Sequence, residues 1–392
     1  MNDMTPPPSG GMLPDSPSGP PSGSPSGASA PRARPLYDGQ AGDLAKISIS
    51  NALLTLATLG IYRFWAKTRI RRYFWSHLSF LDDRLEYSGT AKELLIGFLV
   101  AIAILAPIFV SFHFMELWAG LDQGALGLVA LVQILVIFTL IHLAVFRARR
   151  YRLTRSQWRG IRGGQTGSSF KYAAMAMGWS LVSALTLGLA HPLYRVRLQR
   201  YLMENTWFGD RTFSFKGRAA ELLGPWLLVW LFYLPTLGFI YLWYKVRELR
   251  YFVSQTEYGG LSFRSDLSAG SVFVVYLFYG LAMIFVIGAM AALAAGLVPG
   301  LSEAYMDMAG GDTEAMLANE PLINLFLVAV MAVVVVTFSV IQVLFFLHPL
   351  FRVVAHSLSV IGEEDFSAIA QSRQGLPGRG EGLADALDVG AI

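Results

Sequence analysis

The chain has 392 residues, of which 54% are hydrophobic and only 15% are Asp, Glu, Lys or Arg, and its mean hydropathy is +0.48. A soluble domain carries about 25% charged residues, so this composition excludes an ordinary soluble protein and indicates a polytopic membrane protein. The net charge of +4 is small and predicts no nucleic-acid partner. Because the chain has no cysteine, disulfides, thiolate nucleophiles and thiolate metal sites are excluded.

The two ends of the chain differ in composition from the part between them. Residues 1–34 are rich in Pro, Ser and Gly, and residues 372–392 are rich in Gly and Ala. Such segments cannot bury enough apolar surface to fold. We therefore predict two disordered tails on either side of one repeated membrane domain at 35–371. The first tail also lacks the basic start and apolar core of a secretory signal.

Seven apolar runs divide the predicted membrane domain. Four of them hold no charged residue and are long enough to cross a bilayer core, which takes about 20 residues of helix; they are 94–112, 125–146, 271–298 and 322–347. The other three each carry the tripeptide Thr-Leu-Gly; they are 47–62, 172–194 and 222–244. Glycine after Thr-Leu predicts the end of a helix, because glycine tolerates left-handed dihedral angles.

A basic motif, Arg-x-x-Arg-Tyr, occurs four times after apolar runs. On a helix its two arginines and its tyrosine share one face, and both residue types favour the headgroup level of a bilayer. The motif therefore predicts helix ends at the membrane surface that bind anionic lipid headgroups, or that serve only as topological anchors. The candidate residues are Arg69, Arg72, Tyr73, Arg147, Arg150, Tyr151, Arg197, Arg200, Tyr201, Arg247, Arg250 and Tyr251. A decayed fifth copy lies at 351–353, and residues 348–353 share His-Pro-Leu-aromatic-Arg-Val with residues 191–196.

Short polar stretches with aromatic residues follow three of the copies, at 82–89, 209–217 and 259–263. Turn residues followed by alternating apolar and polar residues predict short strands or hairpins. Such hairpins are too short to be stable alone, so we expect them to pack on the basic helices or on one another. The predicted fold is thus an all-α polytopic membrane protein of repeated helix, basic-stripe and short-hairpin units, with small cytoplasmic β elements.

The distribution of Lys and Arg predicts the topology. If only the four uncharged runs cross the membrane and the three Thr-Leu-Gly runs enter and return, all 31 Lys and Arg lie on one side. If all seven runs cross, some of these residues must lie on each side. Short loops follow the positive-inside rule. We therefore predict four full spans and three re-entrant helical hairpins, with both termini in the cytoplasm.

The opening of the membrane domain resembles a known family. The segments that carry the resemblance are Tyr37-Asp38-Gly39-Gln40-Ala41-Gly42, the run from Asn51 to Tyr62 and Trp65-Ala66-Lys67-Thr68-Arg69. They are similar to the signature of the YjgN-like family of bacterial inner-membrane proteins, which bear a domain of unknown function. The resemblance continues through Asn205-Thr206-Trp207-Phe208-Gly209. It implies a bacterial inner-membrane location and implies no reaction, substrate or cofactor.

Few other residues suggest chemistry. Asn51 and Gln133 are polar residues inside apolar runs and could line a pathway, although such groups more often bond across helices. His142, His191 and His348 each precede a basic stripe, and without metal-ligand spacing we expect them to bond to a helix carbonyl or a headgroup. His113 and Glu116 lie three residues apart near the end of a span, where simple solvation is the expected role.

The sequence therefore leaves three classes of function open. The first is a non-enzymatic membrane protein that binds anionic lipid through a basic, aromatic cytoplasmic layer. The second is a transporter or channel for an unidentified solute, since internal repeats and broken helices occur in many transporters. The third is a lipid-modifying enzyme, which we expect least because the sequence holds no acid–base, nucleophile or phosphate-binding signature. No cofactor is expected.

Overall fold

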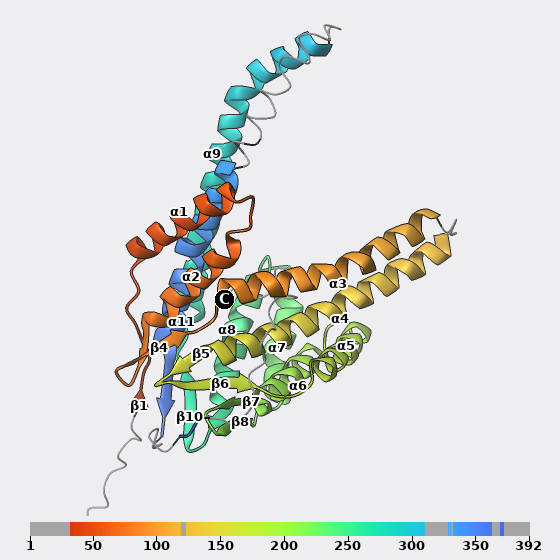
Figure 1. The fold of residues 1–392 in the computed structure, drawn as a ribbon. Coiled ribbons are helices and arrows are strands. Elements are labelled where there is room, and N and C mark those ends of the chain that lie inside the picture. Colours follow the sequence, from red (N-terminus) through yellow and green to blue (C-terminus); the bar gives the residue numbers. More distant parts are fainter. Residues whose placement is uncertain are drawn as a thin grey trace, which may run out of the picture.

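The computed structural model describes residues 32–118, 123–309, 328, 330, 332–362 and 369–371. Helices form most of this part of the chain (Figure 1). They are α1 (Ala41–Ala57), α2 (Arg63–Ser76), α3 (Ala91–Trp118), α4 (Gln123–Arg155), α5 (Ser169–Leu185), α6 (His191–Glu204), α7 (Ala220–Phe232), α8 (Phe239–Ser254), α9 (Ala269–Ala309) and α11 (His348–Ser357). Residues 332–341 and the π-helical turn Gln342–Leu347 lead directly into α11, and we call Ala332–Ser357 the last span.

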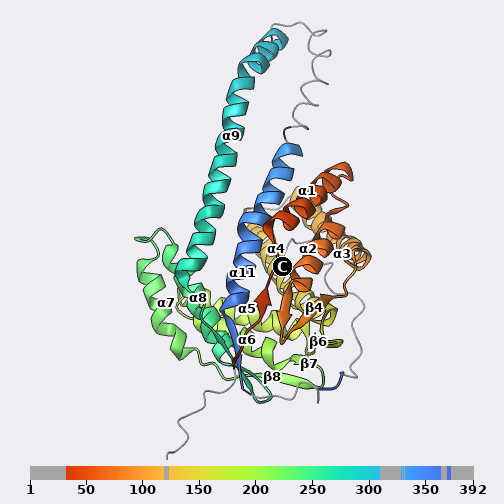
Figure 2. The same ribbon diagram turned by 90° about the vertical axis from the view of Figure 1, so that its left-hand side faces the viewer.

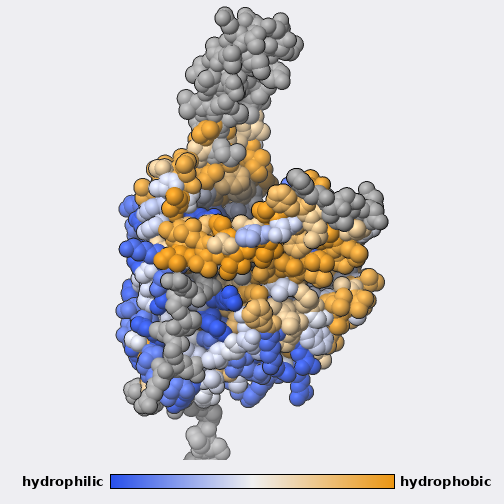
Figure 3. Space-filling model, turned by 45° about the vertical axis from the view of Figure 1, so that its right-hand side comes forward, coloured by the Kyte–Doolittle hydropathy of each residue, from blue (hydrophilic) through white to orange (hydrophobic). Residues whose placement is uncertain are grey.

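Four helical segments are long and apolar enough to cross a membrane: Ala91–Met115, Gly124–Arg155, Ala269–Ala292 and Ala332–Ser357. They overlap the four uncharged runs, which confirms that prediction. Their apolar side chains face outward, with Leu128 65% and Phe285 76% exposed, as expected for surfaces in contact with lipid. Figure 3 shows the resulting hydrophobic band across the helices and a hydrophilic surface at the strand end of the molecule. In Figures 1 and 2, α9 lies beside the last span, and α3 and α4 form a second long pair.

The three Thr-Leu-Gly segments connect shorter helices that fold back on each other as the pairs α1–α2, α5–α6 and α7–α8. With 17 residues, α1 and α5 are roughly 25 Å long at 1.5 Å per residue, less than the ~30 Å of a hydrocarbon core. Glycine adopts the expected left-handed conformation in each turn, and the preceding leucine adopts it too, as in Leu59 with φ 50° and Gly60 with φ 90°. The threonine hydroxyl accepts a hydrogen bond from a backbone N–H at the start of the next helix, as Thr58 does from Tyr62 at 2.9 Å.

All the described strands join into one antiparallel sheet. They are β1 (Arg32–Ala33), β2 (Leu36–Tyr37), β3 (Leu78–Phe80), β4 (Asp83–Tyr87), β5 (Ser156–Trp158), β6 (Ile161–Gln165), β7 (Thr206–Phe208), β8 (Arg211–Phe215), β9 (Thr256–Tyr258), β10 (Leu261–Ser265) and β11 (Leu358–Ile361). The order is β1-β11-β10-β9-β8-β7-β6-β5-β4-β3-β2. Because only Arg34 and Pro35 separate β1 from β2, the two ends of this order meet and the sheet closes into a ring, which we call the strand ring.

The described chain is mostly helical, as predicted, but its β elements are not small, because the 11 described strands form one antiparallel sheet. Short hairpins form at the three predicted places and pair with their neighbours. The second strand pairs through its residues 3 to 5 in β4 and β8, as Leu85 of β4 does with Trp158 of β5, and through its residues 2 to 5 in β10. The β5–β6 hairpin had no predicted counterpart, since its segment Trp158-Arg159-Gly160 lacks alternating apolar residues. Pairing with neighbours gives these short strands the hydrogen bonds that an isolated hairpin would leave unmade.

The N-terminal strands complete the strand ring. The predicted tail 1–34 was expected to be disordered, but Arg32–Ala33 form β1 and pair with β11; residues 1–31 and 372–392 lie outside the described residues. The sequence held a signal for this strand, because Tyr37-Asp38-Gly39 at the end of β2 matches Tyr87-Ser88-Gly89 at the end of β4. Residues 32–37 thus act in the ring as β4 does: their first half pairs with the strand on one side, β11, and their second half pairs with the strand on the other side, β3.

Candidate functional site: the basic helix ends around the strand ring

The tyrosines of the basic motif have partners inside the protein. The Tyr73 hydroxyl accepts a hydrogen bond from the Gln40 N–H at 2.7 Å and donates one to the Gln40 carbonyl at 2.9 Å. Tyr201 does the same with Ser168, and Tyr251 with Arg218, always 33 residues back in the chain. These hydroxyls therefore fix the chain as it passes from a strand into the next helix.

Tyr151 belongs to the second copy of the motif and differs. Its hydroxyl donates to the Glu93 carboxylate at 2.5 Å, and the same carboxylate accepts from Arg155 at 2.7 Å. Tyr151 therefore joins the end of α4 to the start of α3, the two helices of its own pair. Sequence analysis did not assign Glu93 a role, because its two partners lie some 60 residues away along the chain.

The second arginine of three copies also has a partner inside the protein. Arg72 donates to the Gly89 carbonyl at 2.9 Å and Arg200 donates to the Gly217 carbonyl at 2.8 Å. Arg150 donates likewise to the Gly167 carbonyl. Each glycine lies 17 residues further along, after the strand pair. Arg250, in the fourth copy, is exposed.

The first arginine of every copy is exposed: these are Arg69, Arg147, Arg197 and Arg247. Among the described residues none of the four has an acidic partner within ion-pair distance. The Arg197 guanidinium lies 5.6 Å from the ring centre of Trp179, and that of Arg247 lies 5.5 Å from the ring centre of Trp243. Trp243 precedes Arg247 by four residues, so helical spacing could have predicted this pair. Trp179 comes from another helix, and nothing in the sequence links it to Arg197.

One carboxylate at the basic helix ends is buried and neutralised. The Glu248 side chain is 3% exposed and accepts hydrogen bonds from Arg195 at 2.8 Å and from Lys245 at 3.0 Å. Burial alone would raise the pKa of this carboxyl, but the hydrogen bonds and charges of Arg195 and Lys245 outweigh it and hold the pKa below its ordinary value. Glu248 is therefore a structural anion that joins α6 to α8.

The two candidate pathway residues lie apart. Asn51 is buried, accepts a hydrogen bond from Arg69 at 2.9 Å, and lines a cavity of about 220 Å³ between the α1–α2 pair and the last span. Gln133 lies partly exposed on α4 and does not line this cavity. The structure therefore brings one of them into a polar cavity and leaves the other on a helix surface.

Of the three histidines that precede a basic stripe, His142 alone contacts a helix carbonyl, as expected, among the described residues. His142 contacts the Phe138 carbonyl at 2.9 Å and the Tyr194 hydroxyl at 3.1 Å, and His348 contacts the Tyr37 hydroxyl at 3.1 Å. His191 stacks on Trp226, with 4.4 Å between ring centres. Within the described part of the chain, no group of His, Asp and Glu could hold a metal ion. His113 is exposed on α3, and the side chain of Glu116 lies outside the described residues.

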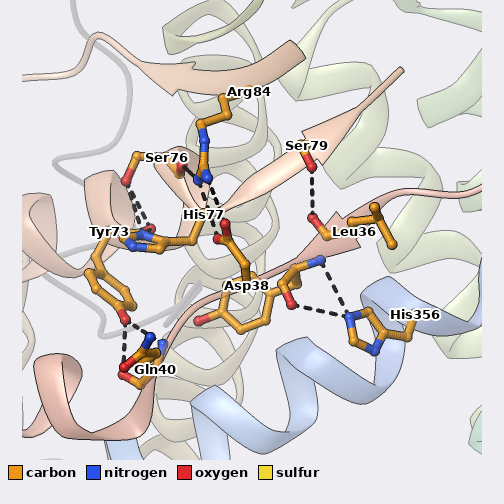
Figure 4. Close-up of polar contacts among 10 residues, drawn as sticks. Leu36, Asp38, Gln40, Tyr73, Ser76, His77, Ser79, Arg84 and His356 are labelled. Carbon is orange, nitrogen blue, oxygen red and sulfur yellow. Dashed lines mark hydrogen bonds and ion pairs between the residues drawn. The ribbon is translucent and has the colours of Figure 1, made fainter. Parts of the chain in front are cut away.

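The segment that carries the family resemblance is the point where the strand ring closes (Figure 4). Asp38 pairs with Arg84 at 2.6 Å, and Arg84 also donates to the Ser76 carbonyl at 2.5 Å. The His356 Nε2 lies 3.3 Å from the Tyr37 N–H and 3.2 Å from its carbonyl. The hydrogen bond from Arg84 holds the pKa of the Asp38 carboxyl below its ordinary value. The signature residues therefore join the first strands to α2, β4 and α11.

Comparison with known proteins gives the family. Residues 33–239 and 213–376 match the family described as "Bacterial protein of unknown function (DUF898)". The chain belongs to this family. It is 33% identical over 69 residues to the inner membrane protein YjgN of Salmonella typhimurium, and 31% identical over 117 residues to that of Escherichia coli O157:H7. These matches confirm the YjgN-like resemblance.

The names of the relatives give a cellular location but no activity. The matched stretches cover 18% and 30% of this chain, and the chain spans only 18% and 27% of the lengths of these two relatives. No solved structure matches this chain. The relatives are named as inner membrane proteins, and the four apolar helices agree with a membrane protein. The family description assigns no function.

Proposed function

We propose that this protein is a non-enzymatic, multi-pass inner-membrane protein that binds anionic lipid headgroups through the exposed arginines at its basic helix ends. The observation that carries the proposal is the position of Arg69, Arg147, Arg197 and Arg247. All four are exposed and lack an acidic partner among the described residues. A guanidinium next to a tryptophan suits the headgroup level, where both residue types are enriched.

The same proposal includes the topology. The leucines at the tips of the three short helix pairs are almost fully exposed, with Leu59 at 94%, Leu187 at 77% and Leu237 at 87%. Exposed leucines at a tight turn are unfavourable in water and favourable in hydrocarbon. This supports three re-entrant pairs whose tips lie within the bilayer, with the strand ring and both termini on the cytoplasmic side.

A transporter or channel remains the second candidate, and one cavity favours it. The cavity beside Asn51 is lined by polar and basic side chains that include Ser48, Lys67, Arg71 and Gln342. However, no residue of the Thr-Leu-Gly turns lines it, and Gln133 lies elsewhere. The headgroup proposal rests on four matching positions, whereas transport rests on this one cavity.

The test of headgroup binding uses two pairs of exposed arginines. The protein is isolated in mild detergent, and the phosphatidylglycerol that it retains is measured by native mass spectrometry. Each basic residue near an anionic surface contributes about 1 kcal/mol, so Arg197→Gln with Arg247→Gln should weaken retention by about tenfold or more.

The matched control is Arg34→Gln with Arg264→Gln. These arginines are also exposed, but they lie in the strand ring and both contact Asp266. The control should retain phosphatidylglycerol as the unmodified protein does. Equal retention by both double variants would contradict headgroup binding at the helix ends.

A further inference from the structure

The strand ring encloses a large apolar cavity. Its volume is about 630 Å³, and side chains from β3, β4, β5, β7, β8, β9, β10 and β11 line it. The alternation along the strands explains this lining. In β8, Phe213 faces the cavity while Thr212 and Ser214 are exposed, and in β10, Phe263 faces the cavity while Arg264 is exposed. The interior of the ring is thus aromatic and aliphatic, and its exterior is polar.

Side chains from other parts of the chain line this cavity at one end and pack on its lining at the other. At the helix end, Gln199 of α6 and Leu249 and Phe252 of α8 line it. At the turn end, Ile369 is 5% exposed and packs on Tyr258 and on other side chains of the lining. An aliphatic side chain of the protein itself therefore already lies against this lining.

Glycine in the β7–β8 turn allows this close approach of Ile369. A Cβ on Gly209 would come within 2.3 Å of the Ile369 Cγ2 and 2.8 Å of the Ala370 carbonyl oxygen. The segment is also held by a hydrogen bond from the Arg162 N–H to the Gln371 Oε1 at 2.9 Å. Residues 369–371 are thus fitted against the turn end of the strand ring.

The polar groups that reach the cavity mostly have partners. The Tyr258 hydroxyl donates to the Phe208 carbonyl at 2.8 Å, the Thr256 hydroxyl donates to the Phe252 carbonyl at 2.8 Å, and Arg195 pairs with Glu248. The cavity therefore offers few directional contacts to a polar ligand. Contact with an apolar group removes the apolar lining from water, so an apolar occupant would be favourable.

We propose that the strand ring binds one acyl chain, either of a free fatty acid or of a lipid. The volume lies within the range of small-molecule sites, about 300–1,000 Å³, and a closed antiparallel sheet of similar strand number can hold one small ligand. The site is separate from the arginines of the proposed headgroup contacts, because it lies inside the ring and recognises the chain by its apolar surface. Its occupancy does not depend on headgroup binding.

The test is photochemical crosslinking of the purified full-length protein in detergent. One arm uses palmitic acid with a diazirine in its chain, and the other uses phosphatidylcholine with a diazirine in one acyl chain. Crosslinked peptides are mapped by mass spectrometry. The expected result is crosslinking within Thr206–Phe215 or Thr256–Ser265 that an excess of unlabelled palmitic acid removes.

The two probes distinguish the source of the chain. Crosslinking in these strands by palmitic acid alone assigns a free fatty acid, and crosslinking by the phospholipid assigns a lipid tail. Crosslinks confined to α3, α4, α9 and the last span with both probes would overturn the proposal, because these helices contact detergent and lipid in any case. The mapping uses the unmodified protein, so it does not depend on a variant that folds.

Three variants sharpen the test. Leu85→Trp adds bulk inside the cavity and should reduce the competable crosslinking several-fold. Leu36→Trp is its matched control, because Leu36 is 62% exposed, and it should change nothing. Ile369→Ala shortens the side chain at the turn end and should increase the crosslinking. If Leu85→Trp and Leu36→Trp crosslink equally, the cavity is not the binding site.

Discussion

The hydroxyls of Tyr73, Tyr201 and Tyr251 each bind a residue between a strand and the following helix. Each hydroxyl accepts a hydrogen bond from the backbone N–H of that residue and donates one to its carbonyl. A helix start has backbone N–H groups without partners in the helix. The tyrosine supplies one such partner from the next helix in the chain. A residue predicted for the membrane surface from its type and spacing thus has a defined contact inside the protein.

The contact of Tyr201 gives the first prediction for a single residue. Tyr201→Phe removes both hydrogen bonds to Ser168, which lie at the surface, so the free energy of unfolding should fall by about 0.5–1.5 kcal/mol. A denaturant titration in mild detergent measures the change.

Tyr241→Phe provides the control for Tyr201→Phe. Tyr241 is 37% exposed, and its ring, which lies 5.1 Å from the Lys245 ammonium, is retained. This variant should change the free energy of unfolding by less than about 0.5 kcal/mol. Equal values for the two variants would show that the Ser168 contact contributes nothing.

The sequence located the basic residues but not their partners. Arg72 and Arg200 were chosen for their helical spacing, and both donate to carbonyls of glycines that lie 17 residues further along. That contact depends on the strand pair between them, which brings the chain back to the helix. The exposure of the first arginines does not depend on the strand pair, because they lie on the outer face of the helix. The headgroup hypothesis therefore stays a prediction for the first arginines and rests on them.

At the scale of elements, the Thr-Leu-Gly turns were the most predictable feature. A glycine after an apolar run indicates a helix end, and all three turns have it. The left-handed leucine was not predicted, since a leucine with positive φ costs roughly 1–2 kcal/mol. The β5–β6 hairpin was also not predicted, because its arginines and glycines hide the period of two that identifies a strand.

The re-entrant pairs predict a labelling pattern for engineered cysteines. The chain has no cysteine of its own, so Leu187→Cys and Asp210→Cys can each be labelled alone with a membrane-impermeant maleimide. Leu187→Cys, at a tip that the proposed topology puts within the bilayer, should react slowly from both sides. Asp210→Cys, at an exposed turn of the strand ring, should react in inverted membrane vesicles and not in intact cells.

Each labelling outcome decides a separate point. Rapid labelling of Leu187→Cys in intact cells would mean that α5 and α6 both cross the membrane. Labelling of Asp210→Cys in intact cells would reverse the predicted orientation. A cysteine at Gly310, which lies outside the described residues, serves as the control for the outer side.

For the whole molecule, the strand ring was not predicted, because the match of Tyr37-Asp38-Gly39 with Tyr87-Ser88-Gly89 indicates a strand but not its pairing partners. Its closure needs Arg32–Ala33 to pair with β11 and Leu36–Tyr37 to pair with β3, two contacts between distant parts of the chain. Periodicity describes neighbours along the chain and carries no information on such pairs. The four spans were predictable because they depend only on length and composition.

The ring closure predicts a dependence of stability on pH. The Asp38 carboxyl has a folded-state pKa below its ordinary value because Arg84 donates to it. Its contribution is therefore fully present above the ordinary pKa and is lost as the pH falls through the lower folded pKa. Asp38→Asn should lower the unfolding midpoint slightly at neutral pH, and this difference from the unmodified protein should vanish in acid.

Thermal unfolding in detergent across this pH range measures the effect of Asp38→Asn. Asp43→Asn is a suitable control, because Asp43 is an exposed carboxylate that contacts only Lys46 among the described residues, at 3.4 Å. Its difference from the unmodified protein should stay small at every pH. A difference for Asp38→Asn that persists in acid would mean that the Arg84 contact does not contribute.

The closure of the strand ring also has a consequence for biosynthesis. β1 leaves the ribosome before the other described strands, yet its partner β11 is the last of them and follows more than 300 residues later. Until then, β1 and β10 each present an unpaired strand edge, which favours association with other chains. A chain that stops before β11 would keep both edges unpaired. Closure of the ring therefore separates chains that contain β11 from chains that do not.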